Sequence, residues 1–498
     1  MNDWPTEMLD MLIVGGGING VGIARDAAGR GLSVLLVEQD DLASHTSSAS
    51  TKLIHGGLRY LEYGEIRLVR EALIERERLW GMAPHIIWPL RFVLPQNQSP
   101  RSGWMVRLGL FLYDHLGGRK KLPGTETIAL KTDEAGTALA DRDGRAFVYS
   151  DCWVEDSRLV ALNALDAAER GATIRTRTRL VAAKRTRDGW TATLATDNGP
   201  QTVRARILVN AAGPWVGNVL SGIARVDSDR GVRLVKGSHI VVPRLYEGDH
   251  AYMLQNPDRR IVFAIPYEGD YTLIGTTDDP WEGPPGTPTI DAEETRYLLD
   301  TIARYFSKSV AEADIVWTYS GIRPLYDDHA ANASAVTRDY VLDVDTGDDQ
   351  APILSIFGGK ITTYRKLAEH ALAELAPHIK RKTAAWTAGA ALPGGDMPDA
   401  DFDAFLATLT TRYPAMPRPL LRRLARAYGT RVAAILGTAR TPADLGPDFG
   451  GGLHRAEVDH LVAHEFARQV DDILWRRSKL GLHVPPGTGE RVAAYLAK

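Results

Sequence analysis

Asp10-Met-Leu-Ile-Val-Gly15-Gly-Gly-Ile-Asn-Gly20, together with Val34-Leu-Leu-Val-Glu38, is the stretch of sequence that decides the fold. The order of apolar run, glycine cluster, helical spacing and second apolar run predicts a strand, a tight turn, a helix and a second strand. The first glycine allows the turn, the third lets the backbone approach a pyrophosphate, and the last lets the helix pack closely on the sheet. The N-terminus of this helix then faces the phosphates, and Glu38 is placed to accept hydrogen bonds from an adenosine ribose. Since a 2′-phosphate would be repelled by that carboxylate, the motif predicts a dinucleotide other than NADP.

The composition is that of a soluble globular protein of two or three domains. Its 498 residues are 44% hydrophobic and 24% charged, and the formal net charge of −3 gives no indication of nucleic-acid binding. Cys152 is the single cysteine, which excludes an internal disulfide and a redox-active cysteine pair and fits a reducing compartment. No apolar run approaches the roughly 18 residues that a spanning helix needs. Residues 1–8 lack the features of a signal or transit peptide, so we expect a cytoplasmic protein.

Hydrophobic periodicity divides the rest of the chain into a β-rich middle and a helical end. A strand at 353–357 runs into Gly358-Gly-Lys360 and is followed by a helix at 363–376. Residues 380–398 lose periodicity and read as a linker. The middle region is predicted to hold strands at 147–154, 173–195, 237–242, 261–266, 271–276 and 314–320, and the C-terminal region helical segments at 401–412, 418–427, 430–437 and 455–480.

Three segments far apart in the chain place small residues directly after an apolar strand. They are Gly15–Gly20, Asn210-Ala-Ala-Gly213 and Phe357-Gly-Gly-Lys360. A nicotinamide dehydrogenase usually needs only the first, whereas a long flavin dinucleotide needs backbone approach at several points. A helix that starts near Thr362 would direct its positive end at the flavin N1/C2=O edge. With no second nucleotide motif and no cysteine pair, the pattern predicts FAD that is reduced by the substrate itself.

With these segments in place, the chain resembles the aerobic, FAD-dependent glycerol-3-phosphate dehydrogenases. The resemblance spans nearly the whole chain, and the order and length of its blocks are far more specific than a nucleotide fingerprint. Two departures are conservative: Ala212 stands where many flavoproteins have Thr, and Thr51 where relatives often have Ser. The matching blocks are residues 15–20, 46–62 (TSSASTKLIHGGLRYLE), 149–153 (YSDCW), 210–215 (NAAGPW), 236–243 (KGSHIVVP), 317–324 (WTYSGIRP), 356–366 (IFGGKITTYRK) and 476–482 (RRSKLGL).

The resemblance implies an α/β fold of the D-amino-acid-oxidase type. In it an FAD-binding Rossmann-type domain is interleaved with an antiparallel β-rich substrate domain over residues 1–380. A linker at 381–399 and a C-terminal α-helical cap domain at 400–498 follow.

The resemblance also implies a reaction and a location. The reaction is oxidation of sn-glycerol 3-phosphate to dihydroxyacetone phosphate by hydride transfer from C2 to FAD N5, with electrons passed to membrane quinone. Such an enzyme binds peripherally to anionic lipid on the cytoplasmic face of the plasma membrane without spanning it. The oligomeric state stays open, with a homodimer among the options.

The glycine-rich segments and the serine-rich stretch at 46–52 are predicted to contact FAD through backbone amides, hydroxyls and an ammonium group. A serine-rich loop is more often a solvated turn, but this one directly follows the nucleotide-binding unit. The predicted FAD contacts are Gly15, Gly16, Gly17, Asn19, Gly20, Glu38, Thr46, Ser47, Ser48, Ser50, Lys52, Ala211, Gly213, Gly358, Gly359, Lys360 and Thr362.

A phosphate dianion that carries a secondary alcohol needs fixed cations and several hydrogen-bond donors. Arg59, Arg323 and Lys360 lie at strand ends or in glycine-rich contexts near the predicted flavin contacts. Most basic residues of a protein belong to its surface or to ion pairs, but the motif positions of these three favour substrate binding. Tyr60 either donates its hydroxyl to the substrate or packs.

Oxidation of the alcohol requires a base for the hydroxyl proton, and histidine has a suitable pKa. His239 is the first candidate because its strand should line the substrate side, and His55 is the second. Either could instead be a histidine that simply packs in the core. Arg323 is also a candidate for polarising the C2 oxygen as the ketone develops.

Several alternatives stay open at this point. A glycerol-3-phosphate oxidase that uses O2 would share the substrate half of the reaction, while an amine oxidase of the same fold or a flavin-binding scaffold would not. Residues 101–121 (RSGWMVRLGLFLYDHLGGRKK) fit either an interfacial amphipathic segment or a buried helix. His460 and His464 stand four residues apart, but without a third ligand we predict no metal.

Overall fold

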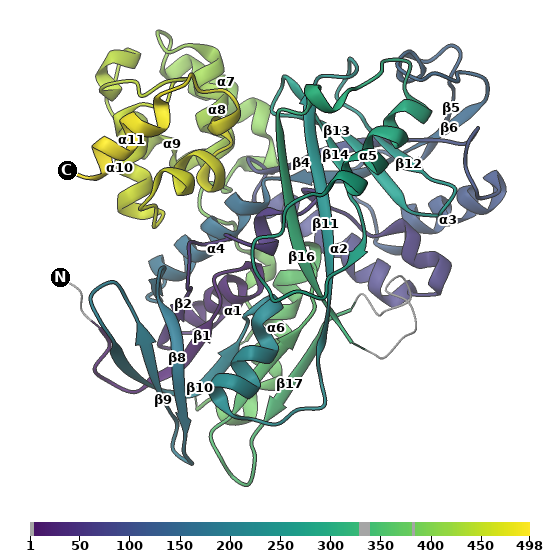
Figure 1. The fold of residues 1–498 in the computed structure, drawn as a ribbon. Coiled ribbons are helices and arrows are strands. Elements are labelled where there is room, and N and C mark those ends of the chain that lie inside the picture. Colours follow the sequence, from purple (N-terminus) through teal and green to yellow (C-terminus); the bar gives the residue numbers. More distant parts are fainter. Residues whose placement is uncertain (1–3, 328–338, 381–383) are drawn as a thin grey trace.

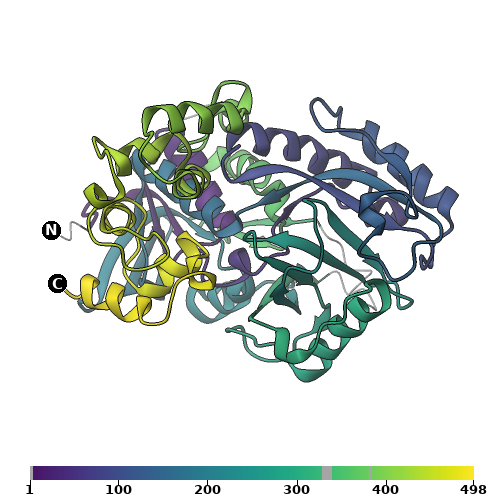
Figure 2. The same cartoon turned by 90° about the horizontal axis from the view of Figure 1, so that it is seen from above.

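The computed structural model describes residues 4–327, 339–380 and 384–498. Two large sheets form the body, and a helical region packs at one side, where the C-terminus lies (Figures 1 and 2). The fold is an FAD-binding α/β fold of the predicted type, with a β-rich second sheet and a C-terminal helical part.

The first sheet has eight strands and contains the βαβ unit from which the sequence prediction started. Its central strands pair in parallel, and an antiparallel hairpin of two strands extends from β10. The order along the sheet is β17 (Val341–Asp345), β18 (Ile353–Phe357), β10 (Gln201–Asn210), β1 (Leu9–Val14), β2 (Val34–Val37) and β7 (Thr173–Arg175), with β8 (Arg179–Arg185) and β9 (Trp190–Ala195) forming the hairpin.

Both faces of β1 are buried, which explains its unbroken apolar sequence. Met11 and Ile13 face a core built with helices, whereas Leu12 and Val14 face the core on the opposite side. Helices that contribute to the first core include α1 (Ile18–Gly29), α4 (Asp156–Glu169) and α6 (Tyr364–Glu374).

The second sheet has ten strands and is mostly antiparallel. The predicted strands at 261–266 and 271–276 form the expected antiparallel hairpin. The order along the sheet is β15 (Asp279–Pro280), β11 (Val232–Pro243), β14 (Tyr271–Gly275), β13 (Ile261–Tyr267), β12 (Ala251–Gln255), β4 (Ile87–Pro95), β6 (Arg145–Val154) and β3 (Leu53–Ile54), with β16 (Trp317–Tyr326) beside β11 and β5 (Glu126–Ala129) beside β6.

Helices cover both faces of this sheet. Ile240 and Val242 pack toward α5 (Ala292–Tyr305), while Val241 packs into the core shared with α2 (Ile66–Met82) and α3 (Gly103–Leu116). Alternate residues of β11 therefore face opposite sides, and His239 shares the side of Val241.

The C-terminal region has a hydrophobic core of its own. The helix predicted over 455–480 is interrupted: it ends at His464, and a short helical segment follows at Asp472–Arg477. The helices are α7 (Phe402–Arg412), α8 (Arg418–Tyr428), α9 (Val432–Leu436), α10 (Arg455–His464) and α11 (Thr488–Leu496).

Part of the stretch that was predicted as a linker packs against α1. The Trp386 Nε1–H donates to the Asp26 carbonyl at 3.2 Å, and the Arg170 guanidinium lies 4.0 Å from the centre of the Trp386 ring. Residues 381–383 of that stretch lie outside the described residues. Within the described part of the chain, none of the helices combines the length and apolarity needed to cross a membrane.

Candidate active site

Three neighbouring cavities run from the end of the first sheet to the second sheet. The nucleotide cavity, of about 560 Å³, is lined by the glycine turn and Glu38. The central cavity, of about 240 Å³, shares Thr46, Ser47 and Gly358 with it. The distal cavity, of about 440 Å³, shares with the central cavity the residues Thr51, His55, Tyr60, Thr276 and Arg323. These shared walls make the three cavities one elongated site.

The glycines of the turn serve two different purposes. Gly15 has φ +115°, and a Cβ there would lie 2.4 Å from the Ala211 carbonyl oxygen. Gly15 and Gly17 line the nucleotide cavity. A Cβ on Gly20 would lie 1.9 Å from the Gly15 carbonyl oxygen, so Gly20 is required for packing inside the turn. Gly16 is not among the described residues that line the nucleotide cavity, and its N–H donates to Glu38 Oε2 at 2.6 Å.

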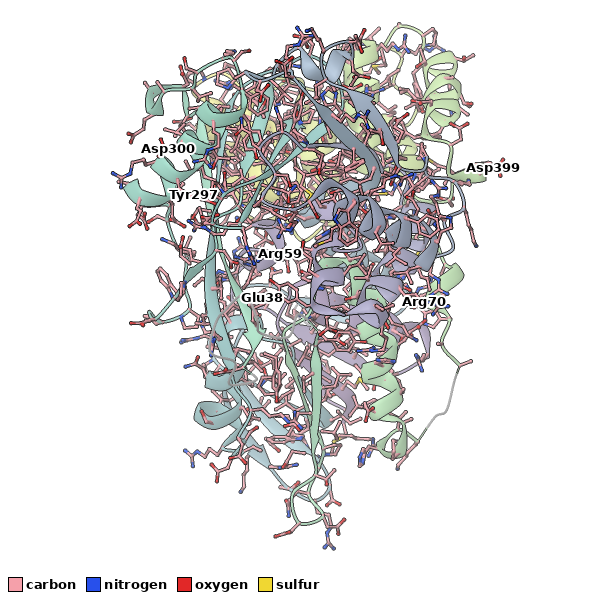
Figure 3. The ribbon with its side chains drawn as sticks, turned by 90° about the vertical axis from the view of Figure 1, so that its right-hand side faces the viewer. Glu38, Arg59, Arg70, Tyr297, Asp300 and Asp399 are labelled. Carbon is pink, nitrogen blue, oxygen red and sulfur yellow. The ribbon has the colours of Figure 1, made fainter. Side chains whose placement is uncertain are left out.

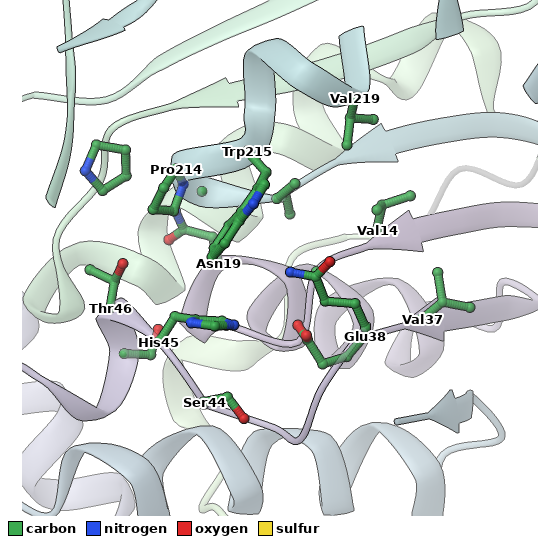
Figure 4. Close-up of a pocket in the computed structure, with 18 of the residues that line it drawn as sticks. Val14, Asn19, Val37, Glu38, Ser44, His45, Thr46, Pro214, Trp215 and Val219 are labelled. Atoms are coloured by element: carbon green, nitrogen blue, oxygen red, sulfur yellow. The ribbon is translucent and has the colours of Figure 1, made fainter. Parts of the chain in front are cut away.

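Glu38 is the acidic group of the nucleotide cavity, as the fingerprint predicted for its place in the chain. Its Oε1 accepts a second backbone N–H, from Asp40, at 2.9 Å. Burial raises the pKa of Glu38, and the two backbone hydrogen bonds oppose that shift. Its side chain points into the same pocket as Asn19 and His45, opposite Trp215 (Figure 4).

The carboxylates of Glu38 and Asp40 and the ring of His45 bring one ligand atom each within 4.8 Å of one another. Both Glu38 oxygens already accept backbone hydrogen bonds, and His45 Nε2 lies 2.8 Å from Asp40 Oδ2. The absence of a metal from the site stays a prediction.

Hydrogen bonds between distant segments build the wall of the central cavity. Asn19 Nδ2 donates to the Gly358 carbonyl at 3.2 Å, and Thr46 Oγ1 donates to the Ile322 carbonyl at 2.6 Å. The His55 N–H donates to Thr362 Oγ1 at 3.2 Å. Thr362 lies in a short turn just before α6, so the start of this helix borders the central cavity. Ala211 and Gly213 of the second segment line the nucleotide cavity together with Gly15 and Gly358. The three glycine-containing segments therefore meet, as expected if a flavin dinucleotide contacts the backbone at several points.

Two predicted cofactor residues have other partners. Ser48 and Lys52 are missing from the described residues that line the three cavities. Lys52 is fully buried, and its Nζ donates to Asp156 Oδ1 at 2.8 Å and to the Ser48 carbonyl at 3.1 Å. Ser50 lines the central cavity, but its hydroxyl also donates to Asp156, at 2.7 Å. A buried ammonium group needs a carboxylate partner, which explains why Asp156 holds Lys52 away from the cavities.

His239 lies on β11 in the wall of the central cavity. Its Nε2 is 3.0 Å from Thr51 Oγ1, and its ring stacks on Tyr319 with 4.6 Å between the ring centres. A Cβ on Gly275 would lie 2.1 Å from the His239 ring, so glycine at that position makes room for the imidazole. Burial, followed by the charges of Lys52 and Arg323, holds the pKa of His239 well below its ordinary value.

His55 lies at the junction of the central and distal cavities. Its removal from water lowers its pKa, and the positive charges of Lys360 and Arg76 act in the same direction, while the carboxylate of Asp151 opposes them. In both histidines the lowered pKa favours the neutral imidazole.

The predicted cations gather around the distal and central cavities. Arg323 lines both, and its Nη2 donates to Asp278 Oδ1 at 2.9 Å. Its buried Nε–H has no acceptor among the described residues. Lys360 Nζ lies 3.8 Å from the centre of the Tyr60 ring. Arg59 lines the distal cavity, and Figure 3 places it in the middle of the molecule, as it does Glu38.

Sequence reasoning missed Arg260 and Asp278 as wall residues of the distal cavity. Arg260 stacks on Tyr297 at 3.9 Å and pairs with Asp258 at 2.7 Å. It follows a turn between β12 and β13, outside the matching blocks, so the sequence carried no signal for it. Asp278 does have a signal, since it lies just after β14 in a stretch rich in hydroxyl and acidic residues.

Comparison with known proteins shows which family the chain belongs to. Residues 10–365 match the family described as FAD dependent oxidoreductase, and residues 385–496 match the family described as C-terminal domain of alpha-glycerophosphate oxidase. Glycerol-3-phosphate dehydrogenase of Pseudomonas aeruginosa is 54% identical over 491 residues, which cover 98% of this chain and 95% of that protein. The chain belongs to the FAD-dependent glycerol-3-phosphate dehydrogenase family.

Other members of the glycerol-3-phosphate dehydrogenase family span the chain equally. The aerobic glycerol-3-phosphate dehydrogenase of Escherichia coli is 49% identical over 99% of this chain and 98% of its own length. D-erythritol 1-phosphate dehydrogenase of Brucella abortus is 54% identical over 96% of this chain and 95% of its own length. Among solved structures, the glycerol-3-phosphate dehydrogenase of Bacillus halodurans complexed with FAD matches with a TM-score of 0.77 at 24% identity, over 99% of this chain and 94% of that one. The predicted fold class and the FAD cofactor are thus confirmed.

Proposed function

We propose that this enzyme oxidises the C2 hydroxyl of sn-glycerol 3-phosphate to give dihydroxyacetone phosphate, and that the electrons pass on to membrane quinone. The observation that carries the proposal is the shared wall of the central and distal cavities, where a cation, Arg323, stands with the neutral imidazole of His55. The central cavity also brings His239 to this place. A phosphate monoester that carries a free secondary hydroxyl needs this combination of a fixed positive charge and a base.

Bound FAD supplies the acceptor for the hydride from C2. Arg323 and Arg59 bind the phosphate, and the N–H groups of their guanidinium ions suit paired contacts with its oxygens. Lys360 adds a point charge, and the ring of Tyr60 beneath it holds the ammonium group in place. His239, whose Nε2 contacts Thr51, takes up the hydroxyl proton. Arg323 stabilises the negative charge that develops on the C2 oxygen.

The pH dependence of turnover should reflect the lowered pKa values of the two histidines. A base of lowered pKa is already deprotonated at neutral pH and loses its function only when the pH falls below that pKa. We expect kcat/KM to stay level from about pH 7.5 down to about pH 6.5 and to fall only at more acidic values. Stopped-flow reduction of the bound flavin under anaerobic conditions would measure this profile. An acid limb centred above pH 7 would contradict a buried histidine base.

D-erythritol 1-phosphate is the second candidate substrate, because the Brucella relative named for it is as similar as the Pseudomonas relative. Both compounds carry a phosphate, a methylene and a secondary alcohol in sequence, so one set of cations and one base serve either. Anaerobic bleaching of the flavin by each compound, compared as kcat/KM, decides between them. Bleaching by neither, but by an amino acid, would point to the amine-oxidase alternative.

The acceptor is tested separately from the substrate. With the better substrate at saturation, turnover with a ubiquinone analogue is compared with hydrogen peroxide formation in air. Quinone reduction that exceeds peroxide formation at least tenfold is expected for a dehydrogenase. The reverse ratio would identify an oxidase.

A quinone acceptor requires contact with lipid, and α3 is the element suited to it. Val106, Leu110 and Tyr113 on one side of this helix are buried. The other side exposes Trp104, Met105, Leu108, Phe111 and Leu112, and exposed Lys120 and Lys121 follow the helix. Neither sequence alternative for residues 101–121 was complete, since the helix is half-buried and half-exposed. We infer that its apolar side enters the interfacial layer of an anionic membrane.

Vesicle sedimentation tests this membrane contact. Leu108→Glu with Phe111→Glu should reduce binding to anionic vesicles at least tenfold, because each carboxylate would have to enter the apolar interface next to anionic lipid. Val462→Glu places one such carboxylate at an exposed apolar residue of α10 and should leave binding unchanged. Equal losses in the two proteins, or none in either, would exclude α3 as the contact.

A further inference from the structure

The segment Asp472–Leu482 of the C-terminal region, here named the bridging segment, lies behind the active site. It contains the whole block 476–482 that marked the family resemblance, yet no described residue of it lines the three cavities. Its side chains make contacts in two places, here called the nucleotide end and the other end of the segment, although the residues alternate along the chain. Arg476 and Arg477 reach the loop after β2, whereas Trp475 and Leu482 reach the second sheet at β16 and β14.

At the nucleotide end, two consecutive arginines hold one aspartate. Arg477 Nη1 and Nη2 donate to the two Asp41 oxygens at 2.6 and 2.8 Å, and Arg476 Nε donates to Asp41 Oδ2 at 2.6 Å. Asp41 and Arg477 are each 1% exposed, so the pair is removed from water. Asp472 adds a further link, because both of its oxygens accept from Arg177 Nη2 at 2.9 Å. Burial with a fork-shaped donor makes this a strong and directional contact.

Asp41 belongs to the loop that forms one wall of the nucleotide cavity. Its N–H donates to Ser44 Oγ at 3.0 Å, and the Ser44 hydroxyl donates back to the Asp41 carbonyl at 2.8 Å. The Ala43 N–H donates to the Gly16 carbonyl at 3.2 Å, which ties the loop to the glycine turn. Ala43, Ser44 and His45 all line the cavity. The arginine pair therefore holds the cavity wall from its outer side.

At the other end, the bridging segment packs on the strand that carries catalytic-site residues. Trp475 stacks on Trp317, the first residue of β16, with 4.7 Å between the ring centres. Two residues further along β16, Tyr319 stacks on His239. The Tyr271 hydroxyl of β14 donates to the Leu482 carbonyl at 2.9 Å.

We propose that the C-terminal region acts through the bridging segment as a brace that holds the FAD-binding loop and the substrate sheet in their working positions. Arg476 and Arg477 are positioning residues for the cofactor, and Trp475 is a positioning residue for the strand that supports His239. This role is independent of which polyol phosphate or which acceptor the enzyme uses.

The first test replaces Arg477 by methionine, which keeps the aliphatic bulk and removes the charged fork. The dissociation constant for FAD should rise at least tenfold, measured by the fluorescence of flavin released from diluted holoenzyme. Arg477→Lys keeps the charge without the paired geometry, so its dissociation constant for FAD should lie between those of the parent enzyme and Arg477→Met. An unchanged FAD dissociation constant in Arg477→Met would overturn the proposal.

Arg423→Met is the matched control. Arg423 makes an equally paired, partly buried contact with Glu457, at 2.7 Å to each oxygen, but inside the C-terminal region. It should lower the melting temperature as Arg477→Met does, with no change in FAD affinity. Equal release of FAD from the two variants would mean that general loosening, and not the brace, is responsible.

Trp475→Leu tests the other end of the brace. It should lower kcat/KM by about threefold to tenfold and shift the acidic side of the pH profile of kcat/KM. The reason is that Trp317 loses its stacking partner, so that the strand with Tyr319, on which the His239 ring stacks, is held less firmly. FAD should stay bound. Release of FAD by this variant, or an unaltered pH profile, would contradict the assignment of the two ends.

Discussion

His239→Gln should lower kcat by about 10²- to 10⁴-fold, the usual contribution of a positioned general base. Glutamine keeps a polar group near Thr51 but cannot accept a proton at neutral pH. His239 is buried on a regular strand, is stacked on Tyr319 and is packed against Gly275, so the change removes the proton acceptor without opening the cavity to water. The variant should remain yellow and bind substrate with little change in affinity. Anaerobic single-turnover reduction of the flavin measures the loss directly.

Two further variants make this prediction decisive. His85→Gln is the matched control, because His85 is also fully buried with a lowered pKa but lines none of the three cavities within the described part of the chain. The kcat of His85→Gln should equal that of the parent enzyme. His55→Gln tests the second candidate for the base. If His55→Gln loses at least 10²-fold in kcat and His239→Gln does not, the roles of the two histidines are exchanged.

Arg323→Met should raise KM by about 30- to 300-fold. Removal of one member of a hydrogen-bonded charge pair costs about 2–5 kcal/mol, and each 1.4 kcal/mol is about tenfold. We take the lower part of this range because the Arg323 side chain is 32% exposed and already shares its charge with Asp278. If Arg323 also polarises the C2 oxygen, kcat falls as well. Steady-state kinetics with saturating acceptor separates the two effects.

Arg233→Met is the control for charge loss near this sheet. Arg233 lies on β11, pairs with Asp327 at 3.3 Å and is outside the walls of the three cavities, as far as the described residues define them. The KM of Arg233→Met should stay within about twofold of that of the parent enzyme. A similar rise in KM for both variants would indicate a general electrostatic effect, and no rise for Arg323→Met would remove Arg323 from the phosphate site.

Local sequence was a reliable guide wherever the physics is local. The glycine turn predicted its own close approaches, since only glycine fits where a Cβ would lie 2.4 Å from the Ala211 carbonyl oxygen. The hairpin of β13 and β14 followed from alternation across a short polar turn. The prediction of a helical segment over 455–480 was wrong in one respect, because periodicity does not detect the interruption between His464 and Asp472.

The site residues show the same distinction between what local sequence predicts and what only tertiary contacts decide. Sequence could nominate Lys52 as a flavin contact but could not reveal that Asp156, more than a hundred positions away, holds its ammonium group. It could nominate His239 and Thr51 separately but could not place them 3.0 Å apart. Arg260 gave no signal, because its position at the distal cavity depends on the pairing of strands.

By itself, the sequence determined the class of fold, the FAD cofactor and the family, because these depend on short motifs whose backbone conformation and spacing are encoded locally. The opening motif, Gly15 to Glu38, specified only the nucleotide end of the cofactor site. Tertiary structure decided which cations reach the distal cavity, which polar groups are used up by buried partners, and how the C-terminal region holds the loop that carries Asp41. These outcomes depend on burial and on contacts between remote segments, since a charge removed from water must take whichever partner the fold brings to it.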